Sequence, residues 1–169
     1  MSAPGPLRAS TGKDEWRTPK YVFDYWNRRY DFTLDAAASK ENAPCEKYYN
    51  ITYDSLNNVW EEKQVAWLNP PFGDVGPWVE RCIYEMDAHG STIVALLPNS
   101  TEARWFHDIY YTASRITLLT GRISFIDQET GKGNGRNANG SIFVEWHPKP
   151  YGRQTPEIRM LSMATLRNG

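Results

Sequence analysis

Hydrophobic positions in the 169-residue chain first recur with the period of a helix. After Thr18 and Pro19, a pair typical of a helix start, apolar side chains stand at helical spacing over residues 21–26. The same spacing returns over residues 77–89 and again over residues 102–111. The pattern therefore predicts three helices.

Between and after these helices the apolar positions form short runs that are typical of strands. The runs lie at residues 31–35, 65–68, 92–97, 115–119 and 141–146. Since helix and strand signals alternate from about residue 30 to residue 120, we expect an α/β sandwich with a mostly parallel sheet. The last two runs are joined through a long loop and predict an antiparallel hairpin at the edge of that sheet.

The two ends of the chain differ from its middle. Residues 1–13 (MSAPGPLRASTGK) are small and polar, with proline and glycine, and predict a mobile N-terminal tail. Residues 14–169 have the length of one domain, so a single domain is expected there. The stretch 131–140 (GKGNGRNANG) predicts a polar loop, while residues 157–169 are compatible with either a strand or a helix.

Composition excludes several classes of protein. A hydrophobic content of 40% and a charged content of 23% are ordinary for a soluble globular protein. The two cysteines, Cys45 and Cys82, form no CxxC motif and the three histidines are scattered, so neither a disulfide framework nor a metal site is expected. A signal peptide and an apolar run of about 20 residues are both absent from the sequence, which predicts a cytoplasmic protein without a membrane partner.

Charge is unevenly distributed along the chain. The formal net charge is -1, so the chain as a whole is not a basic nucleic-acid binder. Residues 1–102 carry ten basic and fifteen acidic residues, whereas residues 103–169 carry nine and five. The basic C-terminal part could contact phosphates, or the imbalance could belong to an ordinary solvated surface.

The strongest candidate for chemistry is the sequence NPPF at residues 69–72. It follows the apolar run 65–68 and therefore lies at the carboxyl end of a predicted strand, where open α/β sheets bind ligands. Two carbonyl oxygens, from the Asn69 side chain and the Pro70 backbone, can each accept one N–H of an exocyclic amine. They would hold the amine while its lone pair, otherwise delocalised into an aromatic ring, develops toward a sulfonium methyl group.

The remaining residues of this motif suit the same chemistry. Pro70 and Pro71 fix the backbone, so both acceptors are preset, and Phe72 can stack on a base. No strong base is needed, because the proton leaves after the amine has become cationic. The predicted catalytic residues are therefore Asn69, Pro70, Pro71 and Phe72, although a Pro-Pro turn can also end a strand without any chemistry.

The motifs of the chain, taken in order, resemble a known family. WRTP at residues 16–19, LDAAAS at 34–39, NPPF at 69–72 and GRISF at 121–125 follow one another as in the small Dam-type DNA adenine methyltransferases of phages and prophages. The resemblance extends from about Trp16 to Trp146. It implies S-adenosylmethionine as the methyl donor, and the N6 amino group of adenine in double-stranded DNA as the acceptor.

The resemblance also implies roles for residues outside the NPPF motif. The WRTP segment matches the part expected near the methionine end of the cofactor, LDAAAS matches the first cofactor loop, and Asp54 matches the acidic position expected at the adenosine. The implied cofactor-binding residues are Trp16, Thr18, Pro19, Asp35, Ala36 and Asp54. Structural roles stay open for three of them, since Trp16 also suits a core, Asp35 a strand-end cap and Asp54 a turn.

Two departures from larger methyltransferases concern this cofactor half. Where those enzymes carry a glycine-rich FxGxG loop, this chain has LDAAAS at residues 34–39, whose alanines do not readily adopt positive φ. In addition, Asn69 follows Asp35 by only 34 positions, and a single βαβ crossover takes about 30 residues. The expected fold is therefore an abridged Rossmann-like methyltransferase sheet.

A base inside a duplex has to be flipped out before its amine can reach a buried methyl donor. The chain has no separate recognition domain, and the loop 131–140 is the best candidate to grip the DNA, although loops of this kind are also commonly just mobile. The candidate nucleic-acid-binding residues are Arg122, Lys132 and Arg136, with Arg104 and Arg115 as weaker ones. A monomer and a homodimer are both compatible with this arrangement.

Other functions fit the same sequence. The acceptor could instead be another planar nitrogen, such as cytosine N4 in DNA, guanine N2 in RNA or a protein glutamine. The altered glycine loop and the near-neutral charge also fit a catalytically inactive module that binds nucleic acid. Binding of S-adenosylmethionine and the identity of the methylated product distinguish these alternatives.

Overall fold

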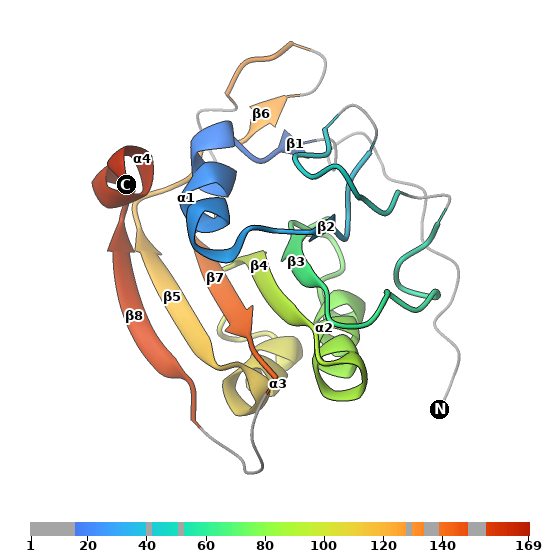
Figure 1. The fold of residues 1–169 in the computed structure, drawn as a ribbon. Helices are drawn as coiled ribbons and strands as arrows, with labels where there is room; N and C mark the ends of the chain where they lie inside the picture. Colours follow the sequence, from blue (N-terminus) through green and yellow to red (C-terminus); the bar gives the residue numbers. More distant parts are fainter. Residues whose placement is uncertain (1–15, 40–41, 51–52, 128–129, 134–138, 149–154) are drawn as a thin grey trace.

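The computed structural model describes residues 16–39, 42–50, 53–127, 130–133, 139–148 and 155–169 (Figure 1). Its elements in chain order are β1 (Trp16–Arg17), α1 (Lys20–Tyr30), β2 (Leu34–Asp35), β3 (Val65–Leu68), α2 (Gly76–His89), β4 (Thr92–Pro98), α3 (Arg104–Thr112), β5 (Arg115–Thr120), β6 (Ile126–Asp127), β7 (Ser141–Trp146), β8 (Glu157–Ser162) and α4 (Met163–Asn168). The predicted tail, residues 1–13, lies outside the described residues, and the single domain over 14–169 stays a prediction.

Six of the strands form one mixed sheet in the order β2-β3-β4-β7-β5-β8. Neighbouring strands pair in parallel except at β7, which is antiparallel to both β4 and β5. The mostly parallel α/β sheet and the antiparallel pair β5–β7 are therefore confirmed. The pair does not form the edge itself, because β8 runs along the outer side of β5, and β7 is buried along its whole length.

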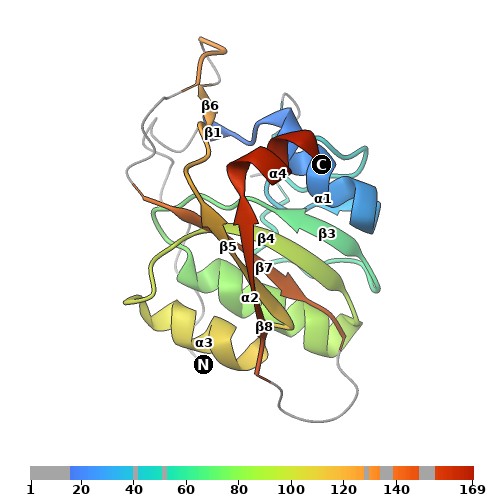
Figure 2. The ribbon, with the colours of Figure 1, turned by 90° about the vertical axis from the view of Figure 1, so that its left-hand side faces the viewer.

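Two layers of helices cover this sheet (Figure 2). Helices α1 and α4 pack on one face, and α2 and α3 pack on the other. Strand β4 shows why the sheet can be covered twice, since Val94 and Leu96 join the core under α1 while Ala95 and Leu97 join the core under α2. A strand with both faces buried is expected to be apolar, as β4 is after its first residue, Thr92.

The helices begin and end close to their sequence signals, with one informative difference. Helix α2 carries proline in its first turn and ends at Gly90, which adopts a left-handed conformation with φ of 66°. Helix α1, in contrast, begins at Lys20, and the N-cap position is held by Pro19. Thr18 does not cap this helix, because its hydroxyl is hydrogen-bonded to Asn69 instead.

The connection between β2 and β3 is short, as the spacing predicts. Within its described residues, which are 36–39, 42–50 and 53–64, no helix forms, and the one ladder contact is a parallel bridge between Tyr48 and Asp35. Trp60, fully buried, anchors this segment to the core beneath α2. The connection therefore covers the end of β2 without adding further strand–helix units, which confirms the abridged sheet.

A separate two-stranded ribbon stands beyond the carboxyl edge of the sheet. Strand β1 pairs antiparallel with β6, so that Trp16 faces Asp127 and Arg17 faces Ile126 (Figure 1). Since β1 leads directly into α1, the ribbon ties the start of the first helix to the connection between β5 and β7. None of the helices within the described segments is long and apolar enough to cross a membrane.

Candidate active site

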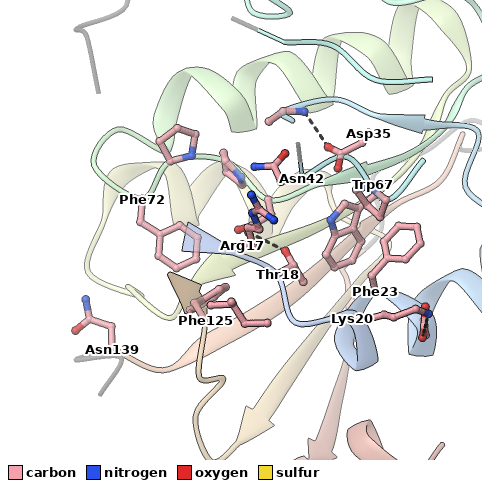
Figure 3. A pocket seen from close by; sticks show the side chains of 17 residues that line it. Arg17, Thr18, Lys20, Phe23, Asp35, Asn42, Trp67, Phe72, Phe125 and Asn139 are labelled. Atoms are coloured by element: carbon pink, nitrogen blue, oxygen red, sulfur yellow. Dashed lines mark hydrogen bonds and ion pairs between the residues drawn. The ribbon is translucent and has the colours of Figure 1, made fainter. Parts of the chain in front are cut away.

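A cavity of about 680 Å³ opens at the carboxyl ends of β2 and β3, on the side covered by α1 (Figure 3). Seventeen residues line it. They come from β1 and the start of α1, from the ends of β2 and β3, from the segment after β2, and from both ends of the connection between β5 and β7. The volume is in the range of natural ligand sites, about 300–1,000 Å³.

The predicted catalytic motif lies on the wall of this cavity. All four residues of the NPPF sequence line it, directly after the buried end of β3. The side-chain amide nitrogen of Asn69 donates a hydrogen bond of 2.8 Å to Thr18 Oγ1. Because that bond uses the nitrogen, the Asn69 Oδ1 is available, and neither it nor the Pro70 carbonyl oxygen accepts a hydrogen bond within the described part of the chain.

Two aromatic rings form an apolar corner of the cavity. Phe72 and Phe125 meet edge to face, with ring centroids 5.8 Å apart and an angle of 87° between their planes. Phe125 is buried, whereas Phe72 is half-buried. The sequence motif GRISF contains Phe125, yet sequence reasoning did not place it in the site. An aromatic side chain in a polar connection was the signal that could have identified it.

Asp35 is the buried carboxyl group of the cavity. It ends β2, lines the cavity, and its Oδ1 accepts a hydrogen bond of 3.1 Å from the backbone N–H of Ala37. Burial raises the pKa of Asp35 to about 7, and the Ala37 hydrogen bond offsets this only in part. No cation within the described residues stabilises its charge, so a ligand that supplies a positive group would do so.

Only some of the other residues expected at the cofactor line the cavity. Thr18 lines the cavity, whereas Pro19 is buried at the start of α1 and Ala36 is fully buried in the core. For Trp16 the structure describes the backbone of β1, not the side chain. Asp54 does not line the cavity.

Asp54 lies in a turn and adopts a positive φ of 50°. Its Oδ2 accepts a hydrogen bond of 2.6 Å from Asn57, while its Oδ1 is buried without a partner among the described residues. The neighbouring Ser55 donates to the backbone oxygen of Ala36, which attaches this turn to the loop after β2. The arrangement includes the predicted turn, and the contact of Asp54 with the cofactor stays a prediction.

The residues expected to contact nucleic acid occupy different places. Arg122 and Lys132 are exposed on the connection between β5 and β7, and Arg136 lies outside the described residues. The far end of the same connection reaches the cavity, because Asn139 lines it (Figure 3). Arg104 is exposed at the start of α3.

Arg115, the second of the weaker candidates, is not part of this site. It stands at the amino end of β5, at the opposite edge of the sheet, and its guanidinium pairs with Glu145 at 2.7 Å and with Glu157 at 2.9 Å. These two ion pairs favour a structural role for Arg115, and a phosphate contact at this residue stays a prediction.

Comparisons with known proteins show the family to which this chain belongs. The model of a family described as DNA N-6-adenine-methyltransferase (Dam) matches residues 8–167. A protein of that name from Escherichia phage T1 is 34% identical over 149 residues, which cover 78% of this chain and 62% of the relative. One from Haemophilus phage HP1 is 33% identical over 144 residues, covering 83% of each chain.

The chain thus spans less than two thirds of the phage T1 relative and most of the phage HP1 relative. Among solved structures, one assigned as an RNA methyltransferase from Pyrococcus horikoshii is similar over 84% of this chain and 90% of that chain. Its TM-score of 0.47 and 13% sequence identity make the similarity too distant to indicate an activity.

Proposed function

Because this chain belongs to the DNA N-6-adenine-methyltransferase (Dam) family, we propose that it transfers a methyl group from S-adenosylmethionine to the N6 amino group of adenine in DNA. The observation that carries the proposal is the geometry of Asn69. Its amide is oriented by Thr18, and its carbonyl oxygen is available at a cavity large enough for ligands. That arrangement suits a site that accepts N–H groups from a planar amine.

The acceptor side of the mechanism follows from two oxygens. Asn69 Oδ1 and the Pro70 backbone oxygen each accept one N–H of the adenine amine, which holds the nitrogen lone pair toward the methyl group. Pro70 and Pro71 keep the two acceptors in place, so little reorganisation is needed when the amine becomes cationic. The extra proton then passes to water, since a methylated aromatic ammonium is a strong acid.

The adenine ring is held by the aromatic corner. In this proposal the nucleotide leaves the duplex, at a cost of a few kcal/mol, and its base enters the cavity beside Phe72. A base stacked on Phe72 would lie nearly perpendicular to the ring of Phe125, because the two phenyl rings are nearly perpendicular. Stacking on aromatic side chains contributes about 1–3 kcal/mol per base, which offsets much of that cost.

In the proposed reaction, S-adenosylmethionine occupies the remaining part of the cavity. When bound, it supplies a methyl group on a sulfonium centre, which needs no metal ion. Asp35, desolvated and without a cation beside it, would pair with a positive or hydrogen-bond-donating group of this molecule. The family resemblance adds Trp16, Thr18, Pro19, Ala36 and Asp54 as its further neighbours.

The exposed cations on the connection between β5 and β7 supply the proposed DNA contacts. Arg122 and Lys132 stand on that connection, and Asn139 joins it to the cavity, so phosphates could be held close to the flipped base. Arg136 belongs to the same proposal. The substrate would be double-stranded DNA in the cytoplasm of a phage host, and the protein would act as a monomer or a homodimer.

A methyl-incorporation assay tests the proposal. The purified protein is incubated with unmethylated DNA and S-adenosylmethionine that carries a tritiated methyl group. Asn69→Ala is expected to lower incorporation about 100- to 1,000-fold, the usual effect of removing one preorganised group that stabilises developing charge. Asn168→Ala, an exposed asparagine at the end of α4, is the matched control and should match the wild type.

Two outcomes of this assay would contradict the proposal. One is the absence of incorporation with the wild-type protein, which would favour an inactive binding module. The other is full activity of Asn69→Ala with folding intact, which would remove Asn69 from the mechanism.

A further inference from the structure

Arg17 places a cation in the wall of the cavity. It is the second residue of β1 and faces Ile126 across the ribbon, so the pairing with β6 fixes its backbone. Its side chain is half-buried and lines the cavity, close to the centre of the view in Figure 3. The neighbouring Thr18 is the residue that binds Asn69, which puts Arg17 beside the acceptor site.

The guanidinium of Arg17 lacks a counter-ion. Two acidic side chains line the cavity, and Asp24 is already paired with Lys20 at 2.6 Å. The other, Asp35, has a pKa raised by burial, with no cation nearby to lower it. Within the described residues Arg17 forms no ion pair, and its Nε is buried without a hydrogen-bond partner.

A half-buried cation with unmet hydrogen-bond donors is unfavourable by itself. An arginine remains charged throughout the physiological pH range, so it cannot escape this cost by losing a proton. Its planar fork of N–H groups matches the two oxygens of a carboxylate or a phosphate. A ligand that brings such an oxyanion into the cavity would satisfy the group that the protein leaves unpaired.

We infer that Arg17 is the oxyanion receptor of this cavity. The inference rests on the proposed function, since the two reactants of that reaction each carry one such anion. The first is the carboxylate at the methionine end of the methyl donor, and the second is the phosphate that flanks the flipped nucleotide. Sequence reasoning assigned Arg17 no role, because its place in the cavity depends on pairing with a strand more than 100 residues later.

Two variants and a matched control test the inference. Arg17→Met removes the charge and keeps much of the volume, whereas Arg17→Lys keeps the charge and removes the planar fork. Arg28→Met removes an exposed arginine near the end of α1 that does not line the cavity. Thermal unfolding with each variant shows whether the fold is retained.

The first arm measures binding of S-adenosylmethionine and of decarboxylated S-adenosylmethionine by calorimetry. If the oxyanion is the carboxylate, Arg17→Met weakens binding of S-adenosylmethionine about 10- to 100-fold, the range expected for hydrogen bonds to a charged group. The same variant changes binding of the decarboxylated molecule less than about twofold. Arg17→Lys should lie between the wild type and Arg17→Met.

The second arm measures DNA binding as a function of salt concentration. If the oxyanion is a phosphate, Arg17→Met leaves both calorimetric affinities unchanged, weakens DNA binding, and lowers the slope of log K against log salt by about 1. Arg28→Met should leave the cofactor affinities as they are. A change in either measurement supports the inference, and the measurement that changes identifies the source of the oxyanion.

The inference is overturned if Arg17→Met stays folded and differs from Arg28→Met in neither arm. If Arg17→Met does not fold, the Arg17→Lys variant and the wild type decide. The inference is then overturned if Arg17→Lys binds DNA as the wild type does and the wild type shows no preference for the carboxylated cofactor. A wild-type protein that neither binds S-adenosylmethionine nor methylates DNA contradicts the proposed function itself, which separates the two failures.

Discussion

The central sheet has a buried carboxyl group at each end of its strands, and the two groups have opposite kinds of partners. We call the side where the parallel strands begin the amino edge and the side where they end the carboxyl edge. At the amino edge, Glu145 is fully buried, and its Oε1 accepts hydrogen bonds from Arg115 and from the Tyr30 hydroxyl. At the carboxyl edge, Asp35 is also buried, but among the described residues its carboxylate accepts a hydrogen bond only from the Ala37 N–H. One oxygen of Glu145 lacks a hydrogen bond, yet its charge is met by Arg115.

The difference separates Glu145, whose charge is paired within the fold, from Asp35, which we propose is paired by a ligand. At the amino edge the charges neutralise one another, and the desolvated Tyr30 beside Glu145 has a raised pKa. At the carboxyl edge some polar atoms around the cavity lack partners within the described residues, among them Asn69 Oδ1 and Arg17 Nε. Unpaired polar groups gathered around one cavity are expected where binding supplies the missing partner.

The largest effect on stability is expected at the amino edge. Arg115→Met would leave Glu145 as an uncompensated buried charge, which costs about 3–5 kcal/mol of unfolding free energy. Methyl transfer by the folded fraction should change little, because Arg115 lies at the far edge of the sheet. Denaturant unfolding measures the loss. A loss below about 1 kcal/mol would contradict the role of Arg115 in compensating the buried Glu145, because an exposed ion pair contributes no more than that.

A substitution at the carboxyl edge is expected to change the unfolding free energy in the opposite direction, by raising it. The pKa of Asp35 is raised from 3.8 to about 7, so its contribution to stability is complete below pH 3.8 and is lost as pH rises through about 7. Asp35→Asn removes the ionised form and should raise the unfolding free energy at pH 8, by at most about 4 kcal/mol. The same variant should bind S-adenosylmethionine poorly.

Denaturant unfolding at pH 5 and pH 8, together with calorimetry, checks this prediction. The stabilisation should be largest at pH 8 and clearly smaller at pH 5, and it vanishes only below pH 3.8, where the carboxyl is protonated in both the folded and the unfolded protein. A variant that is less stable than the wild type at pH 8 would place Asp35 among the structural groups, alongside Glu145.

The next effect concerns the pH dependence of cofactor affinity. If the ionised Asp35 pairs with a positive group of the cofactor, binding releases a proton whenever the free carboxyl is protonated. Affinity should therefore fall about tenfold for each pH unit below about 7, which is the raised pKa. Calorimetry between pH 5.5 and pH 8.5 measures it. Asp35→Asn should give a flat profile, and a sloping one would assign the proton to another group.

The smallest effect is expected at Thr18, which positions Asn69 through one neutral hydrogen bond. Thr18→Val removes the acceptor of that bond and should lower kcat about fivefold, because such a bond is worth about 1 kcal/mol. Thr18→Ser keeps the hydroxyl and should restore most of the rate. Steady-state kinetics separate the two variants, and equal rates for Val and Ser would show that the bond does not orient Asn69.

The strand that carries the NPPF motif could be predicted because its signals are local. An apolar run that stops at two prolines places Asn69 at the end of β3 without knowledge of the rest of the fold. The interval between Asp35 and Asn69 likewise limits what fits between them, and the short irregular connection confirms it. Local pattern and chain length therefore accounted for β3, for the short connection before it and for the position of Asn69.

Features that depend on distant pairing could not be predicted in the same way. Arg17 and Phe125 enter the cavity because β1 pairs with β6, a contact between segments more than 100 residues apart. Thr18 looked like a helix cap, and its contact with Asn69 joins residues 51 positions apart in the chain. Strand β8 and helix α4 share one stretch, which is why a choice between strand and helix was not possible there.

Product analysis tests the central claim most directly. Unmethylated DNA is incubated with S-adenosylmethionine and either the wild-type protein or Asn69→Ala, digested to nucleosides, and examined by mass spectrometry. We expect N6-methyldeoxyadenosine from the wild type and about 100- to 1,000-fold less from the variant. A methyl group found on cytosine N4, or equal amounts of N6-methyldeoxyadenosine from both proteins, would contradict the account of an adenine amine held by Asn69.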